Sequence, residues 1–118
     1  MSRILLIDDD TDMLRLTARW LTKAGYEVDT AASGEDAPGL ISQNRPQLII
    51  LDYMMPKMDG PATLAAIRND PSNTAVPVIF RTGKEDAAMD IPGDCRVVQK
   101  SGGKGALLTA VSDALSMT

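Results

Sequence analysis

Short apolar runs alternate along the chain with segments whose apolar side chains recur at helical spacing. The runs have four to six residues, which is typical of strands in a buried parallel sheet. The predicted strands are Ile4–Ile7, Tyr26–Ala31, Gln47–Leu51, Val76–Phe80 and Arg96–Gln99. This order predicts an α/β fold in which helices cover both faces of a five-stranded parallel sheet.

Polar, proline and glycine residues mark where the predicted helices begin and end. Asp10 stands before the first helical pattern as a cap, and Gly25 follows the end of that pattern. Ser33 with Asp36 resembles a capping box that opens the second helix. Because Pro38 stands inside that helix, we expect the helix to be weak or distorted.

Similar signals bound the second half of the chain. Pro61 suits the first position of the third helix. Residues 84–92 leave room for only a short fourth helix. Gly102, Gly103 and Gly105 predict a loose loop before a last amphipathic helix.

Composition limits the class of protein. The chain has 118 residues, of which 44% are apolar and 24% charged, and this predicts a single domain over residues 1–118. The net charge of −4 argues against direct binding of nucleic acid. The apolar runs are far shorter than the ~20 residues of a membrane span, and the single Cys95 excludes an internal disulfide. We expect a cytoplasmic protein that does not enter the membrane.

Polar residues gather where the predicted strands end, which is where parallel sheets bind ligands. Asp8 and Asp9 follow the first strand, and Asp52 follows the third. Crowded carboxylates repel unless a cation neutralises them, and Mg²⁺ prefers such oxygen ligands. Thr82 and Lys100 would add a hydroxyl donor and a positive charge, which suit a phosphoryl group bonded to an aspartate. The alternative is that the acidic residues only solvate a turn.

These residues lie in segments that resemble the receiver domain of two-component response regulators. The matching segments are Ile4–Asp10, Leu51–Gly60 and Val76–Gly83, followed by Lys100. The sequence distances from the second aspartate to Asp52 (43 residues) and onward to the threonine (30 residues) also fit. The resemblance covers essentially the whole chain. It implies a flavodoxin-like receiver fold with strand order 2-1-3-4-5.

The resemblance also implies roles for individual residues. Asp52 would be the phosphoacceptor. Asp9 would bind Mg²⁺ directly, Asp8 mainly through water, and the backbone carbonyl of Met54 would be a further ligand.

The phosphoryl group itself would bind two further residues. Thr82 would donate a hydrogen bond to it and Lys100 would pair with it. The donor would be a phosphohistidine on a sensor histidine kinase or a histidine phosphotransfer protein, and the chain contains no histidine of its own. The domain would catalyse only this transfer and its own hydrolysis, and would signal to a downstream protein target.

The chain departs from the family pattern near its output face. Val97 stands where members usually have an aromatic residue, and Ser101 where they usually have a proline that follows the lysine. Only 18 residues separate Thr82 from Lys100, which implies a shortened fourth helix. Arg81 is an unusual charge beside the threonine. We expect complete phosphoryl chemistry and an atypical structural response.

Other classes of protein remain open at this point. The chain could be a receiver-like interaction module that is never phosphorylated. An aspartate-nucleophile phosphatase of the dehalogenase type would need a second carboxylate where Met54 stands. A flavodoxin-like cofactor protein would need aromatic side chains to stack on the flavin, and the chain has only four aromatic residues.

Overall fold

Five parallel strands form one sheet at the centre of the molecule. A computed structural model describes residues 2–53, 55, 59–71, 75–83 and 95–116. The strands follow the order β2-β1-β3-β4-β5, as the resemblance implies, and this part of the prediction is confirmed. Their bounds are β1 Arg3–Ile7, β2 Glu27–Ala31, β3 Leu48–Asp52, β4 Val78–Thr82 and β5 Arg96–Gln99.

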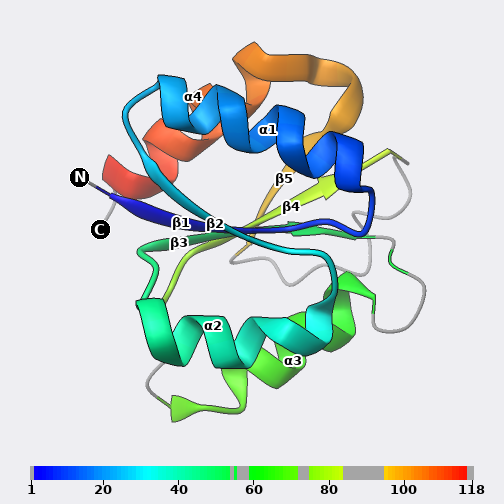
Figure 1. Cartoon of the computed structure of the whole chain (residues 1–118), viewed down its shortest axis with the longest axis vertical. Helices are drawn as coiled ribbons and strands as arrows, with labels where there is room; N and C mark the ends of the chain where they lie inside the picture. The colour runs from blue at the N-terminus through cyan, green and yellow to red at the C-terminus, as the bar shows by residue number, and fades with distance from the viewer. Residues whose placement is uncertain (1, 54, 56–58, 72–74, 84–94, 117–118) are drawn as a thin grey trace.

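Helices cover both faces of this sheet, with α1 and α4 on one face and α2 and α3 on the other (Figure 1). The helices are α1 Thr11–Lys23, α2 Ala37–Asn44, α3 Gly60–Arg68 and α4 Gly103–Ser116. Two 3₁₀ turns, η1 at Gly34–Asp36 and η4 at Lys100–Gly102, stand directly before α2 and α4. The short helix expected within residues 84–92 lies outside the described residues.

Strand β3 shows why the apolar runs are continuous. All five of its residues are buried, because helices cover the sheet on both sides. Ile49 and Leu51 belong to the core cluster beneath α2 and α3. Leu48 and Ile50 belong to the second cluster, beneath α1 and α4. Side-chain alternation along a strand therefore assigns each residue to one of two cores.

Strand β4 is placed two residues later than predicted. It begins at Val78 and continues through Arg81 to Thr82, and its register pairs Asp52 with Arg81. An apolar pattern ends before a charged residue, so it could not include Arg81, whose side chain is only 2% exposed. The strand end therefore brings a buried cation to the same sheet edge as Asp52.

The second helix forms an ordinary α-helix behind a separate turn. The Ser33 hydroxyl hydrogen-bonds the Asp36 carboxylate at 3.3 Å, and neither side chain caps a backbone N–H group. The helix itself begins at Ala37, so Pro38 lies in the first turn, where no backbone donor is required. The expectation of a distorted helix around Pro38 was therefore wrong.

The glycine-rich segment before the last helix is also more ordered than its composition predicts. Helix α4 begins at Gly103 and includes Gly105. Its buried residues Leu107, Val111 and Ala114 pack on the sheet, and this contact outweighs the low helix propensity of glycine. All peptide bonds in the described part of the chain are trans, including the bond between Lys100 and the residue after it.

Candidate functional site

The strand order brings four sequence segments to one edge of the sheet. Asp8 follows β1 and Asp52 ends β3, and these two strands are direct neighbours. Thr82 ends β4 and is buried, and Lys100 follows β5 in the turn η4. Because all strands are parallel, these residues lie at the same edge, as the sequence predicts.

Three carboxylates form a compact cluster at this edge. One oxygen each from Asp8, Asp9 and Asp52 lies within 4.8 Å of the others. Asp8 and Asp52 are buried, whereas Asp9 is exposed to solvent. Asp8 Oδ1 also accepts a hydrogen bond from the backbone N–H of Asp10 at 3.0 Å, which fixes its orientation. Closely spaced hard oxygen donors of this kind fit a divalent cation such as Mg²⁺.

The Lys100 ammonium partly neutralises this cluster. Its Nζ atom lies 3.2 Å from Asp52 Oδ1 and 3.7 Å from Asp8 Oδ2. The side chain of Lys100 is 26% exposed, so it bridges both buried carboxylates from the solvent side. One cation against three carboxylates leaves the cluster with a net negative charge.

The electrostatics of Asp52 reflect this imbalance. Burial and the neighbouring charge of Asp8 raise the pKa of Asp52 from 3.8 to about 7, against the lowering effect of Lys100. The ionised form of Asp52 is therefore costly without a further cation. The burial of Asp52 beside the Asp8 carboxylate therefore fits a bound divalent cation, as the set of oxygen donors does.

A close-packed turn holds the backbone that follows Asp52. The Gly60 N–H donates to the Tyr53 carbonyl at 2.8 Å, and the Asp59 side chain caps α3 through the Ala62 N–H at 2.9 Å. A β-carbon on Gly60 would lie 2.9 Å from the Asp52 carbonyl oxygen. Only glycine fits there, so the turn and the end of β3 are positioned together.

The sequence therefore identified residues that the fold brings together. Asp8, Asp9, Asp52 and Lys100 are in mutual contact or within a few ångströms, and Thr82 lies on the adjoining strand end. Met54, expected as a backbone ligand, lies outside the described residues. The sequence singled out Arg81 only as an unusual charge. Its burial beside the site required knowledge of the strand register.

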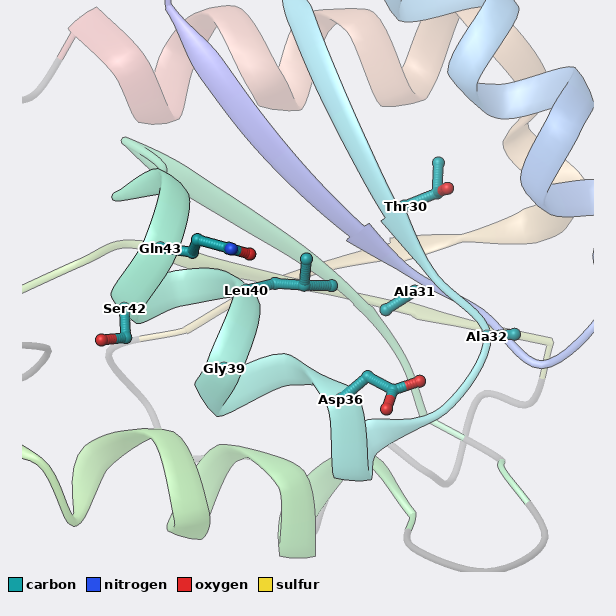
Figure 2. Close-up of a pocket in the computed structure, with 8 residues that line it drawn as sticks. All are labelled: Thr30, Ala31, Ala32, Asp36, Gly39, Leu40, Ser42 and Gln43. Atoms are coloured by element: carbon teal, nitrogen blue, oxygen red, sulfur yellow. The ribbon is translucent and has the colours of Figure 1, made fainter.

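A separate groove lies between the end of β2 and helix α2. Thr30, Asp36, Leu40 and Gln43 are among its lining residues (Figure 2). It contains none of the five polar side chains at the sheet edge and only one carboxylate. Among the described residues, the charged side chains that could bind a cation therefore gather at the acidic cluster and not in this groove.

The fold and the acidic sheet edge together define a receiver of the response regulator type. The profile of the response regulator receiver domain matches residues 4–111. The chain therefore belongs to this family, whose members are signalling modules of two-component systems.

In the part of the chain that the structure describes, every helix is too short or too polar to span a membrane.

Relatives with known names agree with this membership. Over 91 residues the chain is 38% identical to the probable transcriptional regulator ycf27 of Guillardia theta, covering 77% of this chain and 35% of that protein. Over 114 residues it is 34% identical to the response regulator PleD of Caulobacter vibrioides, covering 97% of this chain and 24% of that protein. The chain thus spans about a third or less of the length of these relatives.

Solved structures share the whole fold. The chemotaxis protein CheY4 of Vibrio cholerae superposes with a TM-score of 0.91 at 27% identity. The alignment covers 98% of this chain and 99% of that one. All of the described elements therefore belong to the receiver fold.

Proposed function

We propose that the chain accepts a phosphoryl group on Asp52 in a reaction that requires Mg²⁺. The observation that carries this proposal is the convergence of three carboxylates and the Lys100 ammonium at one sheet edge. Membership of the receiver family supports the general role in a phosphorelay. The roles of individual residues in the transfer are part of the same proposal.

The acidic cluster would hold the cation through Asp8, Asp9 and Asp52, and the Met54 carbonyl is proposed as a further ligand from the family resemblance. A bound Mg²⁺ neutralises charge on the oxygens of a transferring phosphoryl group. The close carboxylate oxygens and the raised pKa of Asp52 support this assignment.

The side chains of this domain would perform the transfer by position and charge. A carboxylate oxygen of Asp52 attacks phosphorus, and the P–N bond of a donor phosphohistidine breaks, so that imidazole leaves with the electron pair. Lys100 already lies 3.2 Å from the attacking carboxylate and would neutralise the incoming phosphoryl oxygens. The Thr82 hydroxyl would donate a hydrogen bond to the same group. Water would later attack phosphorus, the P–O bond to Asp52 would break, and inorganic phosphate would leave as the carboxylate is restored.

None of the 118 residues is a histidine, so the donor histidine would lie outside this sequence. We propose a sensor histidine kinase or a histidine phosphotransfer protein as donor, and a downstream protein as target of the phosphorylated form. A cytoplasmic location, where the single Cys95 stays reduced, is part of the same proposal. We infer one receiver domain over residues 1–118.

The output surface is proposed to respond in an atypical way. Val97, at the family's usual aromatic position, is 39% exposed on β5. An isopropyl group is too small to replace an aromatic ring that rotates between buried and exposed positions. Amide chemical shifts with and without a phosphoryl analogue would test this. A large, ordinary response across residues 84–100 would contradict it.

Intact-mass spectrometry after incubation with acetyl phosphate and Mg²⁺ tests the proposed function. We expect a gain of one phosphoryl group that disappears in Asp52→Asn and when EDTA replaces Mg²⁺. Asp36→Asn is a matched control, because it makes the same change at an exposed carboxylate that is not part of the cluster. No gain in the wild-type chain would favour the alternative, an interaction module that is not phosphorylated.

A further inference from the structure

Arg81 is a buried charged residue that the phosphoryl chemistry does not use. It is the largest fully buried side chain in the described residues, at 2% exposed. Its Nη1 atom donates to Thr17 Oγ1 of α1 at 2.8 Å, and its Nε has no hydrogen-bond partner in the described structure. A guanidinium with an orphaned donor in a protein interior is costly. Packing alone does not explain why a charged arginine stands at this buried position.

The strand register places Arg81 beside the acidic cluster. Arg81 pairs with Asp52 across β3 and β4, which are neighbouring strands, and such strands lie about 4.8 Å apart. Ile50 and Ile79, two residues earlier in each strand, both belong to the core beneath α1 and α4. Side-chain alternation therefore assigns Asp52 and Arg81 to that same face.

Asp8 belongs to this face as well. It lies two residues after Leu6, which is part of the core beneath α1 and α4. Burial lowers the pKa of Arg81, and the charges of Asp8 and Asp52 oppose that change. A guanidinium stays protonated throughout the range in which proteins fold. The cluster is therefore flanked by two cations, the half-buried Lys100 and the buried Arg81.

A count of formal charges shows what the second cation does. Three carboxylates and one ammonium have a net charge of −2, and Arg81 reduces this to −1. A phosphoryl group adds one more negative charge to the site. A fixed positive charge opposes the binding of a divalent cation and favours the added anion.

We propose that Arg81 is a buried counter-charge of the phosphoryl site, which weakens binding of the divalent cation at rest and stabilises the phosphorylated state. The inference rests on the proposed function, because it assumes that the cluster binds both ions. Thr17 Oγ1 accepts a hydrogen bond from this guanidinium beneath α1. Arg81 would act on both ions through its charge.

The test compares Arg81→Met with the wild-type chain by amide chemical shifts. Mg²⁺ alone is titrated first, and we expect roughly tenfold tighter binding in the variant. Beryllofluoride, which mimics a phosphoryl group on a carboxylate, is then titrated at saturating Mg²⁺, and we expect roughly tenfold weaker binding. Structural damage would lower the affinity for both ions. Loss of a positive charge should instead raise the affinity for Mg²⁺ and lower the affinity for beryllofluoride.

Three further variants separate charge from packing. Arg81→Lys keeps the charge and should restore both affinities to within about threefold of wild type. Thr17→Val removes the hydrogen bond that Thr17 accepts but leaves the buried charge in place, and both affinities should also stay within about threefold of wild type. Arg19→Met removes an exposed charge from α1, the helix that contains Thr17. It should change neither the Mg²⁺ affinity nor the beryllofluoride affinity, because exposed charges are screened.

Each result decides between defined outcomes. A wild-type chain that binds neither ion would overturn the proposed function together with this inference. A wild-type chain that binds both, with Arg81→Met unchanged or weakened in both, would overturn only the inference. An effect in Thr17→Val equal to that in Arg81→Met would show that packing sets the affinities, which also overturns it.

Discussion

Asp52→Asn should stabilise the metal-free protein, and the gain should depend on pH. Burial and Asp8 raise the pKa of Asp52 from 3.8 to about 7 in the folded state. The native state therefore binds this proton more tightly than the unfolded state does. Between about pH 4 and pH 7 the native chain holds one extra proton, so its stability falls as pH rises. Asparagine has nearly the same shape and no charge to desolvate.

The size of the gain in stability follows from the shift in the pKa of Asp52. A rise of about three pKa units at 1.36 kcal/mol each gives an upper limit of about 4 kcal/mol above pH 7. The difference between variant and wild type should grow by about 1.4 kcal/mol per pH unit between pH 4 and pH 7. Below pH 4 the two chains should converge, because Asp52 is then protonated in both states.

Urea unfolding followed by far-UV circular dichroism measures this difference. Both chains are unfolded in EDTA at several pH values between 3.5 and 8, and the free energies of unfolding are compared. Asp36→Asn, an exposed carboxylate, is the matched control and should show almost no trend. A constant difference across this range, or a wild-type chain more stable than Asp52→Asn at pH 8, would refute the reasoning.

Four other sites give independent predictions. Lys100→Met removes the ammonium 3.2 Å from the nearest carboxylate oxygen, so the yield of phosphorylated chain in intact-mass spectra should fall at least about tenfold; an unchanged yield would contradict this. Asp10→Ala removes the hydrogen bonds of 3.1 and 3.2 Å that cap α1, so urea unfolding should show a loss of about 1 kcal/mol. Gly60→Ala places a β-carbon 2.7 Å from the Phe80 ring, so the free energy of unfolding in urea should fall by about 2 kcal/mol. Gly39→Ala, whose β-carbon meets nothing within 4 Å, should instead be neutral or stabilising by roughly 0.5 kcal/mol.

The fold could be predicted because the strands are covered on both faces. A strand such as β3, with five buried residues, must be apolar throughout, so it stands out in the sequence. The last helix shows where such patterns fail. Gly103 and Gly105 have low helix propensity, and only the packing of Leu107 and Val111 on the sheet explains why they are helical.

The acidic site could be predicted for a similar reason. Once the strands are known to be parallel, Asp8, Asp52 and Lys100 must share one sheet edge whatever the details of the loops. The role of Arg81 could not be predicted, because a charged residue after an apolar run is normally solvated. Only the register with β3 and the contact to Thr17 show that it is buried.

The cost of Asp52 ionisation can be compared with the free energy that a conformational switch of the domain would need. A penalty of about 4 kcal/mol corresponds to a factor of about 10³ in an equilibrium constant. A cation that neutralises the buried Asp52 carboxylate recovers part of this free energy in the state that binds it. Moving a two-state equilibrium from 1:99 to 99:1 needs about 5.5 kcal/mol of differential affinity. The cost of burying the Asp52 charge, to which Asp8 adds, is therefore comparable with what such a switch needs, and Mg²⁺ should stabilise the wild-type chain more than Asp52→Asn.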